Sequence, residues 1–140
     1  MLQLEIHLPL RPMEALSVQT LPAGDEWQYE PKWDGFRCLA FREGPKIELQ
    51  SKSTQPLARY FPELVAALRR LKAKIFALDG EIAIPAGRGF SFDALLQRIH
   101  PAASRVQRLA AEIPAIYVVF DLLADGGRTF VIDSATLHAA

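Results

Sequence analysis

The sequence predicts an α+β domain with largely antiparallel sheets and packed helices. Half of its 140 residues are hydrophobic and 23% are charged, which is typical of a globular protein with a real core. Apolar strand patterns are joined by hairpin turn signals, and helical patterns are mixed among them without strict βαβ alternation. These two observations favour antiparallel sheets over a doubly wound parallel sheet.

The first half of the chain indicates an extended lead-in followed by strands. Prolines and a glycine interrupt residues 1–25, so the domain proper is expected over 26–140. Strands are predicted over 27–32, 36–42 and 46–51, with a hairpin turn at 43–45. Both faces of the segment 36–42 are largely apolar, which predicts an interior strand.

Apolar spacing also places the later elements. Pro62 can occupy the first turn of a helix, and leucines follow it at helical spacing, so a helix is expected over 62–73. A strand over 75–85 is expected to break at Asp79-Gly80, a pair that is common in turns. The remaining expected elements are a short helix around 92–99, a helix over 103–113, and strands over 116–123 and 128–132.

Charge and cysteine content bear on the partners and the cellular compartment of the protein. Sixteen basic residues balance sixteen acidic ones, so no global positive field indicates a nucleic-acid partner. The single cysteine, Cys38, cannot form an internal disulfide and fits a reducing cytoplasm. The start of the sequence does not predict a signal peptide, and the sequence contains no apolar stretch of bilayer length, so we expect a cytoplasmic protein without a membrane partner.

An unusually framed lysine lies in the stretch EPKWDGFR, residues 30–37. A lysine attacks an electrophile only as the free amine, which requires desolvation or a nearby cation. Trp33 and Phe36 could exclude water from Lys32, and Arg37 could add positive charge. An ordinary strand end followed by a β-turn would give the same four-residue pattern K-x-D-G.

Carboxylates and an aromatic residue accompany two later strands. ALDGEIAIP, residues 77–85, contains Asp79 and Glu81, and YVVFDLLADGG, residues 117–127, contains Phe120 and Asp121. Carboxylates of this kind can hold a ribose hydroxyl or a divalent cation, and an aromatic ring can stack on a purine. Taken singly, each pattern also fits a turn or a core phenylalanine.

Together, the ordered segments resemble the adenylation domain of ATP-dependent DNA ligases, particularly small bacterial ligases and the ligase modules of bacterial end-joining enzymes. The resemblance covers nearly everything from Pro12 to Phe130. It runs through KWDGFR at 32–37, SKSTQPLARYFPEL at 51–64, LDGEI at 78–82, FDALLQR at 92–98, HPAASRV at 100–106 and FDLL at 120–123.

The resemblance implies a nucleotidyltransferase in which Lys32 attacks the α-phosphate of ATP and becomes lysyl-AMP. Glu30 would lie beside the adenine, and Phe120 would stack on it. Arg37 and Glu81 would contact the ribose or the phosphates, with Glu81 also near a Mg²⁺ or Mn²⁺ ion.

Lys52 stands where the family usually has arginine after the motif serine, and it would also contact the nucleotide. Lysine keeps the charge of arginine but not its planar fork.

In such ligases AMP then passes to the 5′-phosphate of nicked double-stranded DNA, and the strand is sealed in repair or recombination. End-joining proteins are the protein partners that the resemblance suggests. The family's later metal-binding and lysine motifs and its OB-fold domain do not occur before Ala140, so we expect the amino-terminal part of a ligase. An RNA ligase or a capping-type enzyme, and a non-catalytic truncated remnant, remain as alternatives.

Overall fold

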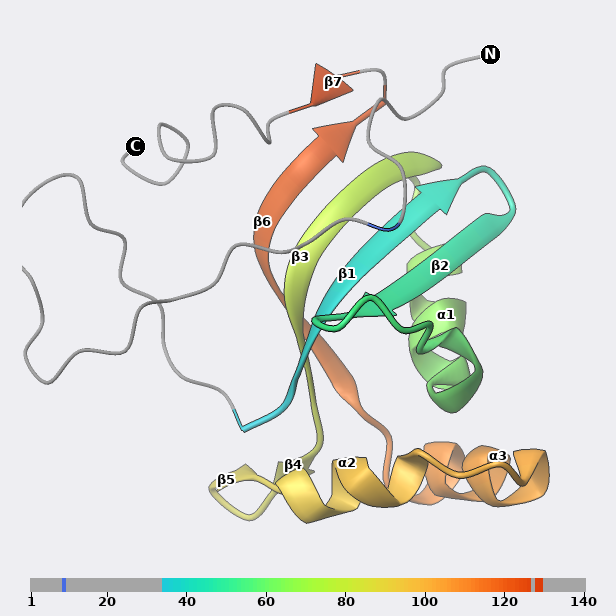
Figure 1. The fold of residues 1–140 in the computed structure, drawn as a ribbon, viewed down its shortest axis with the longest axis vertical. Coiled ribbons are helices and arrows are strands. Elements are labelled where there is room, and N and C mark those ends of the chain that lie inside the picture. The colour runs from blue at the N-terminus through green and yellow to red at the C-terminus, as the bar shows by residue number, and fades with distance from the viewer. Residues whose placement is uncertain (1–8, 10–33, 127, 130–140) are drawn as a thin grey trace, which may run out of the picture.

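The computed structural model describes residues 9, 34–126 and 128–129 and is built around a five-stranded sheet (Figure 1). The strand order is β2-β1-β3-β6-β7, and every neighbouring pair is antiparallel. A second sheet has two short strands, β4 and β5. The elements are β1 (Phe36–Glu43), β2 (Lys46–Ser51), a 3₁₀ turn (Ala58–Tyr60), α1 (Pro62–Arg69), β3 (Ile75–Ala83), β4 (Pro85–Ala86), β5 (Gly89–Phe90), α2 (Phe92–Arg98), α3 (Ala103–Glu112), β6 (Ile116–Asp125) and β7 (Arg128–Thr129).

This architecture confirms the α+β class and the antiparallel sheet. The segment predicted as an interior strand is β1, which lies between β2 and β3. The predicted hairpin joins β1 to β2, and Gly44 turns it with a φ of +61°, a conformation that glycine adopts without steric cost. None of the described helices is long and apolar enough to cross a membrane.

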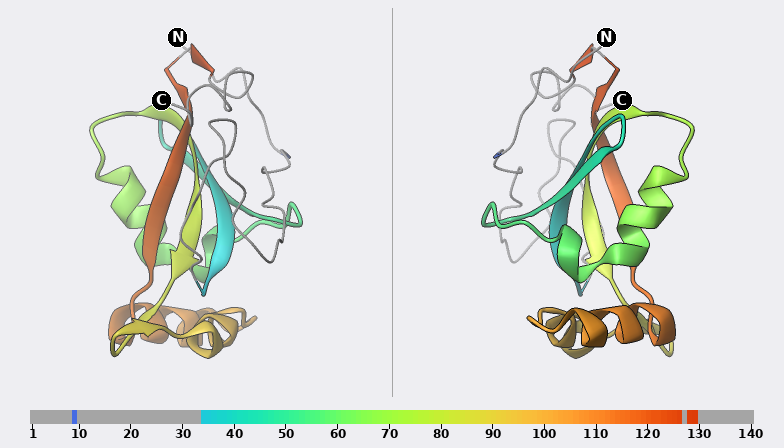
Figure 2. Two further views of the ribbon diagram at one scale, coloured as in Figure 1. Left: turned by 90° about the vertical axis from the view of Figure 1, so that its left-hand side faces the viewer. Right: turned by 90° about the vertical axis from the view of Figure 1, so that its right-hand side faces the viewer.

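The sheet has two different faces. Helix α1 covers one of them, which we call the helix face, and α2 and α3 run across one end of the sheet (Figures 1 and 2). Because side chains alternate along a strand, Phe36, Cys38 and Ala40 point to the helix face, whereas Arg37 and Leu39 point to the opposite one, the second face. The main core fills the helix face and includes Cys38, Ala40, Leu49, Phe61, Leu64, Leu68, Phe76, Ile82, Ile84 and Leu95.

Helix α1 ends at Arg69, four residues before the predicted end at 73. The buried side chain of Arg42 on β1 explains the early end. Its Nη1 donates to the carbonyl oxygens of Leu68, Leu71 and Ala73 at 2.9, 3.2 and 3.2 Å. A side chain from the sheet thus satisfies the carbonyl of Leu68 in the last turn of the helix and two carbonyls in the chain beyond it, so the helix need not continue.

The predicted break in the third strand is wrong, because β3 runs unbroken through Asp79 and Gly80. Gly80 is needed there for close approach rather than for a turn. A Cβ atom at Gly80 would overlap the carbonyl oxygen of Val118 and would lie 3.0 Å from two ring carbons of Tyr117, both on β6. Strand β6 and the ring of Tyr117 can therefore pack this closely only against a residue without a side chain.

Other expected elements are confirmed with shifted ends or lie outside the described residues. Strand β6 continues two residues beyond its predicted end, and β7 is described over Arg128–Thr129. The predicted strand over 27–32 falls outside the described residues. So does the lead-in over 1–25, apart from Pro9.

We expect the substitution Gly80→Ala to lower the free energy of unfolding by roughly 1–3 kcal/mol, the usual cost of overpacking a well-packed site. Urea unfolding measures the change. Gly89→Ala is a matched control, because a Cβ at Gly89 would meet no atom within 4 Å. Equal effects of the two substitutions would contradict the close-approach role of Gly80.

Candidate functional site

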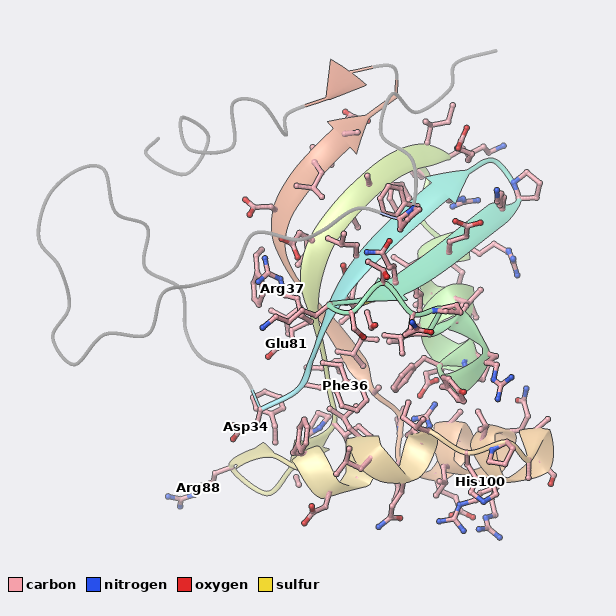
Figure 3. All side chains as sticks on the ribbon, viewed as in Figure 1. Asp34, Phe36, Arg37, Glu81, Arg88 and His100 are labelled. Atoms are coloured by element: carbon pink, nitrogen blue, oxygen red, sulfur yellow. The ribbon has the colours of Figure 1, made fainter. Side chains whose placement is uncertain are left out.

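Charged side chains from three strands meet on the second face of the sheet. Arg37 on β1 lies directly opposite Glu81 on β3, and Asp79 on β3 lies directly opposite Asp121 on β6. Figure 3 shows Arg37 and Glu81 near each other beside the sheet, on the side away from α1. Strand pairing thus brings together residues that the sequence places in three separate segments.

A two-pronged ion pair joins Arg37 to Asp79. Nε of Arg37 donates to Oδ1 of Asp79 at 2.7 Å, and Nη2 donates to Oδ2 at 2.5 Å. The Asp79 side chain is 3% exposed and that of Arg37 is 19% exposed, so the pair is largely shielded from water. Two parallel hydrogen bonds fix the plane of a guanidinium group as well as its position.

Phe120 reaches the site through a β-bulge. Gly80 pairs with Val119 and Asp79 pairs with Asp121, so Phe120 is an extra residue on β6. A bulge re-aims side chains relative to strict alternation. The guanidinium carbon of Arg37 lies 6.0 Å from the centre of the Phe120 ring, at the outer range of a cation–π contact. An aromatic surface therefore adjoins the ion pair.

Phe36 does not share this face, although the sequence grouped it with Arg37 around Lys32. Its ring packs edge-on against Phe61 and Phe92, with ring centres 6.4 and 5.5 Å apart. Figure 3 shows it pointing toward α2. Phe36 thus anchors the first residue of β1 in the helix-face core, while Lys32, Glu30 and Trp33 lie outside the described residues.

Gly35 brings the chain that enters β1 close to Glu81. A Cβ atom at Gly35 would overlap the carbonyl oxygen of Ile82 and lie 3.1 Å from Cγ of Glu81. The glycine of the motif therefore permits a backbone approach that any other residue would block. From Gly35 onward, the chain therefore enters β1 beside the side chain of Glu81.

Lys52 lies in the tight turn that follows β2 and is exposed. The turn is held by a bond from the Ser51 amide to the Gln55 carbonyl at 2.8 Å and by one from the Gln55 amide to Ser51 Oγ at 3.0 Å. Ser51 is opposite Cys38, the neighbour of Arg37. The structure therefore brings Arg37, Glu81 and Phe120 together and places Lys52 in an adjoining turn.

Two groups on the helix face behind the site stay protonated. Burial raises the pKa of the Cys38 thiol to about 12, which makes it a poor nucleophile. Burial also raises the pKa of Tyr117 well above its usual value, and the nearby Cys38 and Asp79 raise it further. Sequence reasoning missed Tyr117 and the pairing of Asp79 with Arg37; the glycine inside an apolar strand was the available signal for Tyr117.

The same face offers carboxylates that could hold a metal ion. Within residues 34–126, no group of three or more His, Cys, Asp or Glu side chains is arranged as a metal cage. Mg²⁺ commonly needs only one or two carboxylates, because substrate phosphates and water complete its shell. The carboxylates of this face are compatible with that mode of binding.

Comparisons with known proteins agree on one family. A family model described as the ATP dependent DNA ligase domain matches residues 12–136. DNA ligase C of Mycobacterium tuberculosis is 50% identical over 134 residues, which cover 92% of this chain and 37% of that protein.

Two solved structures are similar in fold. The ligase domain of LigD from M. tuberculosis has a TM-score of 0.57 at 25% identity and matches 79% of this chain and 33% of its own. A mycobacterial DNA ligase D complexed with ATP and MES has a TM-score of 0.50 at 26% identity, over 71% of this chain and 30% of its own. The chain thus spans less than half the length of each of these proteins.

Removing the charge of Asp79 should destabilise the domain, because it removes the carboxylate charge that two hydrogen bonds pair with the partly buried Arg37 guanidinium. We expect Asp79→Asn to lower the free energy of unfolding by roughly 3 kcal/mol or more. Glu112→Gln removes a charge from an exposed site at the end of α3 and should change it by less than about 0.5 kcal/mol. Urea unfolding at neutral pH measures the free energy of unfolding of both variants. Equal losses in Asp79→Asn and Glu112→Gln would show that the Arg37–Asp79 ion pair does not stabilise the domain more than an exposed charge does.

The buried thiol predicts a pH dependence of stability. The folded-state pKa of Cys38, about 12, lies above the ordinary thiol value of 9.0, so the unfolded state loses this proton first. Stability is therefore complete below pH 9 and falls as the pH rises toward 12, by at most about 1.4 kcal/mol per pH unit for one group. Urea unfolding at pH 8 and pH 10 should show a smaller loss in Cys38→Ala than in the unchanged protein. Parallel losses in both would contradict this assignment.

Proposed function

Because the chain belongs to the ATP-dependent DNA ligase domain family, we propose that the protein containing it joins DNA strands at the expense of ATP. The observation that carries the proposal is the second-face site at the start of β1, where Arg37 is held by Asp79 next to Glu81 and Phe120. A cation, a carboxylate and an aromatic ring are the groups that recognise phosphate, ribose and base. They lie beside the strand that the motif lysine precedes.

In the first step that we propose, Nζ of Lys32 attacks the α-phosphate of ATP. A nitrogen–phosphorus bond forms, the bond to pyrophosphate breaks, and the amine loses its proton, giving lysyl-AMP. Phosphoryl transfer depends chiefly on placement and on neutralisation of charge. Gly35 and Phe36 support the placement, because both hold the chain that follows Lys32 against the sheet.

The other residues have binding roles in this proposal. Arg37 contacts the ribose or the phosphates, and the fixed plane of its guanidinium supports directional contacts. Phe120 stacks on the adenine, with Glu30 beside the same base. Lys52 adds a positive charge from the adjoining turn.

Glu81 is the residue that we assign to a divalent cation, Mg²⁺ or Mn²⁺. Such an ion, when bound, would neutralise phosphate charge. Glu81 also lies next to the chain that enters β1, which supports a second contact to the ribose.

The later steps belong to the whole protein. AMP passes to the 5′-phosphate at a nick in double-stranded DNA, and a 3′-hydroxyl then displaces it to seal the strand. We assign to this chain the amino-terminal part of the adenylation domain, residues 26–140. DNA is thus the proposed macromolecular substrate, and end-joining proteins are proposed partners.

The lysyl-AMP intermediate gives a direct test on the whole protein that contains this chain. Incubation with ATP labelled at the α-phosphate should transfer label to the protein, and Lys32→Arg should abolish the transfer. Lys74→Arg, at an exposed position, is the matched control and should keep it. Label from GTP instead of ATP would indicate a capping-type enzyme. No label from either nucleotide, with the fold intact, would overturn the proposal and leave a non-catalytic role.

A further inference from the structure

Tyr117 makes an unusual contact across the helix face of the sheet. It lies on β6 opposite Ile82, and its ring packs over the backbone of Gly80. Its hydroxyl donates to the carbonyl oxygen of Cys38 on β1 at 2.7 Å and lies 3.4 Å from the carbonyl oxygen of Leu78 on β3. A side chain from the fourth strand in the order thus reaches the backbone of the second.

This hydroxyl lies directly behind the ion pair of the site. Cys38 follows Arg37 in β1, and Leu78 precedes Asp79 in β3. Because successive side chains project from opposite faces, Arg37 and Asp79 meet on the second face while Tyr117 contacts the backbone from the helix face. The hydroxyl of Tyr117 therefore contacts the backbones of β1 and β3 on the helix face, directly behind the Arg37–Asp79 pair on the second face.

The strand ladder is irregular at this point. The register between β3 and β6 shifts between Ala77 and Leu78 and again between Asp79 and Gly80. Bulges disrupt regular ladder bonds and bend the strand. The ladder between β1 and β3 is regular through Asp79, so the irregularity is confined to the β6 side. A side chain of β6 that bonds the backbone of β1 therefore adds a tie across the irregular pairing.

We propose that Tyr117 is a positioning residue: by tying β6 to the backbones of β1 and β3 behind the site, its hydroxyl sets the Arg37–Asp79 pair in the geometry that receives the nucleotide. This inference rests on the proposed function for its consequence in binding. The tie itself rests on the hydrogen bond to Cys38 and on the packing over Gly80. Tyr117 touches no reacting atom in this scheme and acts through Arg37.

The variant Tyr117→Phe tests the role in the whole protein, because it keeps the ring over Gly80 and removes the hydroxyl alone. We expect the KM for ATP in lysyl-AMP formation to rise roughly two- to tenfold, the equivalent of one hydrogen bond, with kcat nearly unchanged. Tyr60→Phe removes a hydroxyl from the 3₁₀ turn before α1, at a residue that packs against the helix-face core, and should leave both constants unchanged. An unchanged KM in Tyr117→Phe overturns the proposal even if stability falls, since the hydroxyl then serves folding alone.

A second measurement does not depend on catalysis. The urea midpoints of Tyr117→Phe, Asp79→Asn and the double variant form a double-mutant cycle. We expect the double variant to shift the midpoint by less than the sum of the single shifts, because each change loosens the same pair. Additive shifts overturn the coupling. If the unchanged protein forms no lysyl-AMP, the proposed function fails on that result, whereas the cycle still decides whether Tyr117 positions the pair.

Discussion

The buried carboxylate of Asp79 is the constraint on which the rest of the site depends. A carboxylate that is 3% exposed is stable in the folded chain only with a well-placed partner, and Arg37 supplies it through two hydrogen bonds. The pair is diagonal, because Arg37 lies opposite Glu81 and Asp79 lies opposite Leu39. A slip of one residue between β1 and β3 would turn one partner toward the apolar helix face. The ion pair therefore selects the strand register that also brings Glu81 to Arg37.

The helix face supports this register by packing at its two ends. Near the start of β1, Phe36 is held edge-on by Phe61 and Phe92. At the opposite end, Arg42 joins β1 to the end of α1 through three carbonyl oxygens. Strand β1 is thus fixed to the helices at both ends, and the charged side chains between these points are presented by a rigid backbone.

The sequence was sufficient for the features that depend on local pattern. Alternation and turn residues predicted β1 as an interior strand and its hairpin to β2, and the ordered motifs pointed to Arg37, Glu81 and Phe120, which the structure brings together. Non-local features were missed for a physical reason. The partners Arg37 and Asp79 are 42 residues apart, and strand register decides their meeting. Asp-Gly is common in turns, so the glycine inside the apolar strand indicated a break rather than space for a ring, and alternation cannot reveal a bulge that adds one residue.

A second buried ion pair links helices α1 and α2 and, through Phe61, contacts strand β1. Arg98 on α2 donates from Nη2 to Oε1 of Glu63 on α1 at 2.6 Å, and Oε2 of Glu63 accepts the Ala115 amide at 3.1 Å. The guanidinium carbon of Arg98 also lies 4.9 Å from the centre of the Phe61 ring, which packs against Phe36. Contacts thus run from α2 through Phe61 to the first residue of β1 without touching the second face. The charged side chains of the site lie on the second face of the sheet, whereas packing on the helix face fixes much of the position of the strand that carries Arg37.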